Sequence, residues 1–437
     1  MISALVQRPA TPAQIAGAGS AVRLAQAFRS TRTVLVADPA LSDRLEILDP
    51  GGFLWVEDAG LPAGIETASK LARRLDQSGV ERLLAVGGGN TMDVAKLAVA
   101  MASDPSVEPF LRRIGDRNGV AILPRPLAGH IEFGVIPSTF GTGSEVNAGA
   151  CYESPRSDDG DPWPGRAKNL VLLEGLSTSM VAYDPGFLEA PPWLAAEGLL
   201  EPAVRLLTSM VEGGSALGYS EAQGRWLLGA AGANLLAGTE SGFRLSSQQR
   251  LDAALLSAES HAGWSLRGRG PAPSSLWFLA NELSMALGIR KNQASILLLG
   301  PWLAAVAGGN TVWGDGQKLE ELWPLVANGV ARAASVARLG PDHALGSGGR
   351  LSEGKRPGSD ASGKGTSGGG SLVPADLVPP SPIQSDLADA LARNTLRRFG
   401  RGRPMKKELA REQLSEMFAA GIRAAGLTDL RIDPYGS

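Results

Sequence analysis

The first 190 residues alternate between short apolar runs and stretches with the apolar spacing of amphipathic helices. One helical stretch covers residues 63–78, and another begins at Thr91. Strands that alternate with helices predict a mostly parallel sheet with helices on both faces, so the first part of the chain is assigned to the α/β class. The predicted strands lie in VLVADP (34–39), GFLWVED (52–58), LLAVGGG (83–89) and FGVIPS (133–138).

From Pro191 onward apolar residues recur at helical spacing, and strand candidates are almost absent. This change predicts an α/β domain over residues 1–190 and an all-helical domain over residues 191–437. The predicted helices cover residues 193–211, 222–237, 246–265, 275–287 and 293–307, with helical pattern again from Leu387 and over 406–425.

The segment at about 345–382 is rich in Gly and Ser in its first part and poor in apolar residues. It cannot bury enough apolar surface to offset the entropy of ordering it. We therefore expect a disordered insertion within the helical domain.

Composition narrows the class of protein. With 42 basic and 44 acidic residues, the chain has no net charge that would attract nucleic acid or an anionic membrane. Cys151 is the single cysteine, which excludes an internal disulfide and any cysteine-based zinc or iron–sulfur site. No apolar run reaches membrane length and the first residues lack a signal-peptide core, so we expect a cytoplasmic protein.

The segment LLAVGGGNTMDVAK (83–96) carries the first chemical signal. A buried strand over 83–86 and a helix from Thr91 place Gly87, Gly88 and Gly89 in the turn at the N-terminus of the helix. Free N–H groups and the helix dipole favour an anion there, and glycines let a diphosphate approach the backbone. The alternative is a tight strand-to-helix connection, which needs glycine anyway.

A second segment, VIPSTFGTGSEV (135–146), opens from a short apolar run into a loop of hydroxyls and glycines. Together, GGGNTMDVAK and PSTFGTGSEV resemble, in order and spacing, the paired signatures of the iron-containing alcohol dehydrogenase-like family, which shares its fold with dehydroquinate synthases. The resemblance extends to residues 15–28, 34–41 and 180–188, and beyond about residue 200 only the helical pattern matches.

The resemblance implies a dinucleotide-binding α/β domain with NAD as cofactor. Asp93 and Lys96 would lie behind the diphosphate loop, the alternative being a simple surface pair. Hydroxyls of the second loop would line the diphosphate and nicotinamide, although hydroxyls also cap helices. The corresponding residues are Gly87, Gly88, Gly89, Asn90, Thr91, Asp93, Lys96, Ser138, Thr139, Thr142 and Ser144.

Asp38 closes the run VLVAD. A carboxylate there can accept hydrogen bonds from the adenosine ribose and would repel a ribose phosphate. By resemblance this position selects NAD over NADP. The alternative is an Asp that forms a turn before Pro39.

The family's metal ligands have no counterparts in this chain. By resemblance, one Asp and three His hold iron or zinc, the first two in a pattern like GxDAxxH. The corresponding helix here reads GLLEPAV, with Leu200 and Val204 at the ligand positions, and the other two fall at Phe278 and Asn292. Such side chains hold no iron or zinc, so we expect no metal.

A dehydrogenase without a metal needs another group to take the proton from the alcohol. The candidates are Lys168, Arg205, His261, Glu282 and Lys291. Lys168 ranks first, because relatives often carry a lysine near the cofactor at this place. His261 is kept as the second catalytic candidate. The alternatives are that Lys168 is a solvated surface lysine and that His261 is a structural histidine whose hydrogen bonds are made within the fold. Lys291 with Asn292 is also a candidate receptor for a substrate carboxylate.

These features predict an NAD-dependent oxidoreductase that acts on a small molecule or peptide bearing a hydroxyl group. The metal-free pattern resembles the dehydrogenases of daptide-type ribosomal peptide biosynthesis, in which a C-terminal Thr undergoes oxidative decarboxylation. One alternative is a non-catalytic NAD-binding scaffold or partner subunit. Another, a lyase of the dehydroquinate synthase type, is disfavoured because that chemistry also needs a metal.

We expect a homo-oligomer and a peptide-recognition partner protein, with no nucleic acid or membrane partner. The run RRFGRGRPMKK (397–407) concentrates six basic residues. It would suit an acidic peptide or partner surface, the alternative being a solvated helix boundary.

Overall fold

The computed structural model describes residues 12–59, 64–115, 118–128, 131–155, 166–213, 217–269, 274–337, 382–400 and 409–425. Its main sheet contains six parallel strands in the order β1-β9-β6-β4-β2-β3. The predicted α/β class is confirmed. The strands are β1 (Ala13–Ala16), β2 (Thr33–Ala37), β3 (Trp55–Asp58), β4 (Arg82–Gly87), β6 (Glu132–Pro137) and β9 (Met180–Tyr183).

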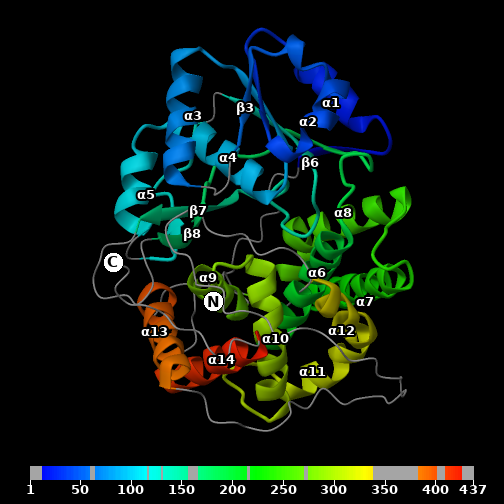
Figure 1. The fold of residues 1–437 in the computed structure, drawn as a ribbon, viewed down its shortest axis with the longest axis vertical. Helices are drawn as coiled ribbons and strands as arrows, with labels where there is room; N and C mark the ends of the chain where they lie inside the picture. The colour runs from blue at the N-terminus through cyan, green and yellow to red at the C-terminus, as the bar shows by residue number, and fades with distance from the viewer. Residues whose placement is uncertain are drawn as a thin grey trace, which may run out of the picture.

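Helices cover both faces of this sheet (Figure 1). Leu35 and Leu84 of the central strands pack with α1 on one face, whereas Val34 and Leu83 pack with α3 and α4 on the other. Strands covered on both faces read as continuous apolar runs, which is why β2 and β4 were predictable. The helices are α1 (Ser20–Phe28), α2 (Ser42–Leu45), α3 (Ile65–Gln77), α4 (Gly89–Ser103) and α5 (Val107–Gly115).

A second, three-stranded sheet was not predicted. It has the order β5-β8-β7, with β5 (Val120–Ile122), β7 (Gly149–Pro155) and β8 (Arg166–Leu172). Strands β7 and β8 pair antiparallel, and β7 lies against α4. Polar residues such as Lys168 and Asn169 interrupt the apolar pattern of β8, which hid the strand.

The remainder is helical, as predicted, and occupies the lower half of Figure 1. Two helices, α11 and α12, were not predicted. One core joins most of these helices to Phe140 and Val146 of the second loop. The helices are α6 (Pro192–Glu212), α7 (Gly218–Glu240), α8 (Ser247–Ala262), α9 (Leu276–Leu287), α10 (Lys291–Ala307), α11 (Gly316–Leu322), α12 (Ala327–Ala337), α13 (Pro382–Phe399) and α14 (Arg411–Ala424).

Some predicted boundaries need correction. Helix α4 begins at Gly89, two residues before Thr91, because Gly87 still belongs to β4 and Gly88 alone links the two elements. The predicted insertion at about 345–382 lies outside the described residues except for Pro382, where α13 begins, and the predicted helix start at Lys406 also lies outside them. None of the described helices has both the length and the apolar composition needed to cross a bilayer.

Candidate functional site

Three parallel strands end side by side at the carboxyl edge of the main sheet. The N–H of Asp38, just after β2, donates to the carbonyl of Val86 on β4 at 2.9 Å. The N–H of Ser138, just after β6, donates to the carbonyl of Gly87 at 2.9 Å. The predicted residues Asp38, Gly87 and Ser138 therefore meet at one edge, where ligands of open α/β sheets bind.

The glycines bring the two loops into contact. A Cβ added at Gly88 would lie 3.1 Å from Oγ1 of Thr139, and one at Gly89 would lie 3.0 Å from Cγ2 of Thr142. No side chain in the described part of the chain caps the N-terminus of α4. Its first N–H groups can therefore receive an anion, and the residues present fit the diphosphate of a dinucleotide.

Asp93 and Lys96 are buried, so they are not a surface pair. Asp93 accepts hydrogen bonds from Oγ of Ser144 (2.6 Å) and from N–H of Cys151 (2.9 Å). Nζ of Lys96 lies 3.4 Å from Asp93 and donates to the carbonyls of Ser144 (2.9 Å) and Gly149. The pair therefore holds the second loop in place from behind, whereas Asn90 is exposed at the start of α4.

Asp38 forms the turn that was the alternative role considered for it. Its Oδ1 accepts the N–H of Ala40 at 3.0 Å and caps the short helix Pro39–Leu41. Since this bond uses one oxygen, the second remains available at the end of β2 for a ribose hydroxyl.

His261 lies against the second loop. A Cβ at Gly143 would collide with the His261 ring, so only glycine permits this contact, and Gly143 also has a φ of 59°. Nδ1 of His261 lies 2.9 Å from the carbonyl of Ser257, and because a carbonyl only accepts, Nδ1 carries the proton. Nε2 then holds a lone pair 3.9 Å from Oε1 of Glu201. Burial lowers the pKa of His261 well below its usual value, and Arg205 adds to this effect.

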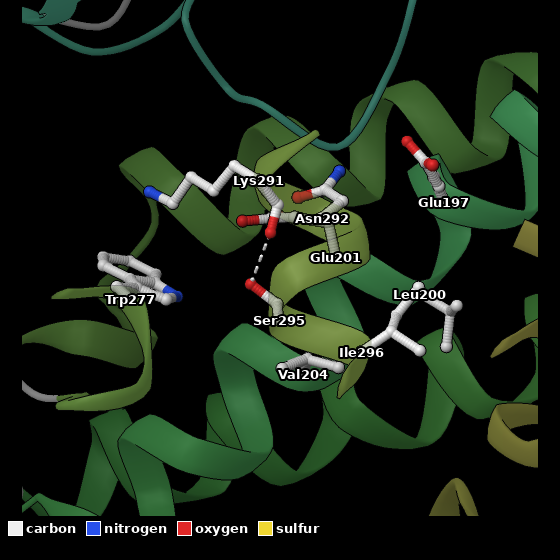
Figure 2. Close-up of a pocket in the computed structure, with 9 residues that line it drawn as sticks. All are labelled: Glu197, Leu200, Glu201, Val204, Trp277, Lys291, Asn292, Ser295 and Ile296. Atoms are coloured by element: carbon white, nitrogen blue, oxygen red, sulfur yellow. Dashed lines mark hydrogen bonds between the residues drawn. The ribbon is translucent and has the colours of Figure 1, made fainter. Parts of the chain in front are cut away.

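Helices α6, α9 and α10 border an open hollow beside this loop (Figure 2). Gly198 of α6 and Gly141 of the loop lie so close that a Cβ at Gly141 would be 3.1 Å from Cα of Gly198. The loop and the hollow are therefore neighbours. The hollow is lined by Glu197, Leu200, Glu201, Val204, Trp277, Lys291, Asn292, Ser295 and Ile296.

Three of the positions aligned with metal ligands, Leu200, Val204 and Asn292, come together in this hollow. The fourth, Phe278, instead packs against Phe399 with ring centroids 4.8 Å apart. Among the described residues no group of three or more His, Cys, Asp or Glu side chains is arranged to hold a metal. The residues present do not fit an iron or zinc ion.

The two carboxylates of the hollow are paired with arginines. Glu201 bonds to Arg205, and Glu197 lies 2.6 Å from Arg290. Burial raises the pKa of Glu201, and Arg205 opposes this rise. Burial lowers the pKa of Lys291. Neither Glu197 nor Trp277 was identified from the sequence, because neither belongs to a motif.

Lys168 does not line the hollow, although its charge acts on Lys291. Glu282 is buried against Arg398, whose Nη2 also donates to the carbonyl of Lys168 at 2.8 Å and to Oδ1 of Asn169 at 2.5 Å. Arg398 is therefore an internal clamp, and the basic run that begins at Arg397 is not simply a solvated boundary. The rest of that run, from residue 401, lies outside the described residues.

Glu145, at the end of the second loop, was also missed. Its side chain is buried, and Oε2 has no hydrogen-bond partner within the described residues. Burial raises the pKa of Glu145 to about 7, against the opposing charge of Lys96. The groups that act on it, Lys96 of α4, Tyr183 of β9 and Glu201 of α6, lie far from it in the sequence, so its environment could not be predicted from the loop sequence.

Comparison with known proteins agrees with this geometry. Residues 12–160 match the model of the family "Iron-containing alcohol dehydrogenase". A hydroxyacid-oxoacid transhydrogenase, mitochondrial, of Caenorhabditis briggsae is 37% identical over 106 residues, which are 24% of this chain and 20% of that protein. The matched segment thus spans about a fifth of the curated relative's length.

Solved structures extend the likeness to the whole fold. An NADH-dependent butanol dehydrogenase A of Thermotoga maritima has a TM-score of 0.65 at 14% identity, with 95% of this chain and 97% of that chain covered. An iron-containing alcohol dehydrogenase of Thermococcus thioreducens has a TM-score of 0.65 at 15% identity, with 95% and 99% covered. A sulfoacetaldehyde reductase of Bifidobacterium kashiwanohense in complex with NAD+ has a TM-score of 0.55 at 15% identity, with 77% and 92% covered. The chain therefore has the fold of the iron-containing alcohol dehydrogenases, and its residues 12–160 resemble that family in sequence.

Proposed function

We propose that this protein is an NAD-dependent oxidoreductase that moves a hydride between the cofactor and a hydroxyl-bearing carbon without a bound metal. The observation that carries the proposal is the junction of the two loops with the hollow. Gly143 of the second loop touches His261, His261 faces Glu201, and Glu201 lines the hollow. A substrate in the hollow would thus lie beside a cofactor held by the loops.

The chain's own residues supply the cofactor contacts. The N-terminal amides of α4 would receive the diphosphate, and Asp38 would accept a ribose hydroxyl. Thr139 and Thr142 line the other side of the glycine turn. The Ser144 hydroxyl donates a hydrogen bond to the Asp93 carboxylate and therefore positions the loop. When bound, NAD+ supplies the hydride acceptor.

Oxidation of an alcohol also releases the hydroxyl proton, which a protein group must take. Glu201 lines the hollow and His261 lies directly behind it, with a lone pair on Nε2. Burial raises the pKa of Glu201, so its carboxylate is the better first acceptor, and the neutral His261 ring offers the Nε2 lone pair as the next one. We assign the proton to His261 through Glu201. Lys168 is the weaker candidate, since it does not line the hollow.

The finer identity of the substrate belongs to the same proposal. A C-terminal Thr of a daptide-type peptide would be oxidised at its β-hydroxyl to a β-keto acid, which loses carbon dioxide without a metal. The hollow opens between helices, beside the second loop, and is lined by both apolar and charged side chains. A cytoplasmic homo-oligomer, assisted by a partner protein that recognises the peptide, is the corresponding biological setting.

A non-catalytic NAD-binding scaffold is the second candidate, favoured by Leu200 and Val204 in place of metal ligands. Against it stand Glu201, His261 and Lys291, since buried ionisable groups lower stability and cluster at functional sites.

The deciding experiment measures NADH formation from a panel of alcohols and hydroxy acids with a chelator present, alongside NADH binding. We expect turnover in the wild type and its loss in His261→Gln with NADH affinity retained. Tight NADH binding with no turnover of any compound would instead establish the scaffold. Activity that appears only after iron or zinc is added would refute the metal-free reaction.

A further inference from the structure

We infer that the hollow binds the carboxylate of an anionic substrate, with Lys291 as the receptor of its charge. The inference rests on the proposed function, because it names the substrate class of the same site. Lys291 is the first residue of α10, and its side chain lies on the Trp277 side of the hollow (Figure 2).

The charges that line the hollow do not balance. Arg290 neutralises Glu197 at 2.6 Å, and Arg205 neutralises Glu201. Within the described residues no carboxylate lies within ion-pair distance of the Lys291 ammonium. Without a ligand, the ammonium of Lys291 is therefore the one positive charge of the hollow that is not balanced by a carboxylate of the described residues.

The surroundings of Lys291 make this surplus costly. Its Nζ lies 5.7 Å from the centroid of the Trp277 ring, and the same ring stacks on the Arg205 guanidinium at 3.8 Å. The ring attracts both cations, but burial disfavours the Lys291 charge, and the charges of Lys168 and Arg205 repel it against the attraction of Glu201. An anion bound beside Lys291 would relieve this repulsion.

Further donors lie at the same place. Asn292 lines the hollow with its amide, in the first turn of the 17-residue helix α10. The N–H of Arg290 is already bonded to Gln293, and no other side chain of the described chain caps this helix. The helix dipole therefore also favours a negative charge at the hollow.

The other residues that line the hollow indicate the chemistry of the rest of the ligand. Leu200, Val204 and Ile296 offer an apolar surface for a short carbon chain, and Glu201 offers a carboxylate for a hydroxyl. A single ammonium with one amide suits a monoanionic carboxylate, whereas bidentate arginines, here already paired with Glu197 and Glu201, suit phosphates. The substrate class is a hydroxy acid, free or at the C-terminus of a peptide.

Equilibrium binding of matched probes tests this. Calorimetry compares lactate with propylene glycol, and N-acetylthreonine with its amide, in the full-length protein with and without saturating NADH. We expect each acid to bind at least roughly tenfold more tightly than its neutral partner, as one hydrogen bond to a charged group predicts. Equal affinity within both pairs, or no saturable binding of either acid, would overturn the inference.

Variants locate the receptor. Lys291→Met should lose the preference for the acids, Lys291→Arg should retain part of it, and Lys70→Met, an exposed lysine on α3, should change nothing. Undiminished acid binding in Lys291→Met would contradict the assignment, as would a loss of NADH affinity in that variant, which would place the cofactor's phosphates there. Acid binding that depends on Lys291 in a protein without NADH binding or turnover would uphold the anion site and reject the proposed oxidoreductase.

Discussion

At the carboxyl edge of the main sheet the candidate site is made of backbone, whereas in the hollow between α6 and α10 it is made of charged side chains. The edge offers uncapped amides at Gly89 and glycines that let two loops touch. The hollow offers two carboxylate–arginine pairs and the surplus charge of Lys291. Backbone sites depend on local sequence, while side-chain sites depend on which helices pack together, so the two regions should respond differently to substitution.

The largest effect is expected from breaking a buried ion pair of the hollow. Arg205→Met leaves the Glu201 carboxylate buried without its partner, which should lower the free energy of unfolding by about 3–5 kcal/mol. Urea denaturation measures the change. The double variant Arg205→Met with Glu201→Gln should recover most of the loss. A single variant as stable as the wild type would show that the pair does not support the hollow.

Glu145 links the two regions and gives a pH dependence. Its folded pKa of about 7 exceeds the usual 4.5, so its contribution to stability is fully present below 4.5 and is lost as the pH rises through 7. Over this window the wild type should lose up to about 3 kcal/mol from this group. Glu145→Gln should flatten the dependence in urea titrations at several pH values, and an unchanged slope would contradict the raised pKa.

At the sheet edge, Gly88→Val places a side chain against Thr139 and over the amides of α4. NADH affinity should fall roughly a hundredfold, or about 2.7 kcal/mol, while the hollow keeps its ion pairs. Fluorescence titration with NADH measures it. Gly229→Ala is the matched control, because a Cβ there meets nothing within 4 Å. A folded Gly88→Val variant that binds NADH with wild-type affinity would show that the sheet edge does not bind the cofactor.

A smaller effect is expected at Asp38. Asp38→Ser removes the charge that opposes a ribose phosphate but keeps an oxygen that can accept the Ala40 N–H, so the turn should survive. The preference for NAD over NADP should narrow by roughly tenfold, about 1.4 kcal/mol. Competitive titration of both cofactors tests this, and equal binding of the two by the wild type would show that Asp38 is no selector.

The smallest effect is expected from removing metal. Because Leu200 and Val204 offer no lone pairs to a cation, chelators should leave NADH binding and any turnover unchanged. Elemental analysis of the purified protein should find no stoichiometric iron or zinc. One tightly held transition metal per chain, lost together with activity, would contradict the assignment of the hollow.

The backbone half of the site was largely predictable. Apolar runs predicted β2, β4 and β6, and the glycines between β4 and α4 predicted the first loop. Both patterns could be recognised because each lies within about a dozen consecutive residues. The surface-pair alternative for Asp93 and Lys96 was wrong, since burial by β7 and the second loop cannot be read from a helix alone.

The side-chain half could be predicted only in part. Resemblance placed Leu200, Val204, Phe278 and Asn292 together. The structure brings Leu200, Val204 and Asn292 into the hollow, but the prediction was wrong for Phe278, which packs on Phe399 from a helix more than a hundred residues later. The pairing of Glu197 with Arg290 and the position of Trp277 depend on how α6, α9 and α10 pack, and single-helix patterns do not encode that. The assignments of Lys168 and His261 as catalytic groups stay predictions, as does the domain boundary at residue 190.

The Arg398 clamp also dictates an order of events during synthesis. Arg398 follows Lys168 by 230 residues and Glu282 by 116. At roughly 5–20 residues per second, a ribosome needs on the order of ten to fifty seconds to travel from β8 to this arginine. Until then Asn169 and Glu282 lack a partner that they have in the finished protein. The strand β8 is therefore synthesised early but gains this contact late, and a nascent chain stopped before α13 would carry a second sheet without the Arg398 contact.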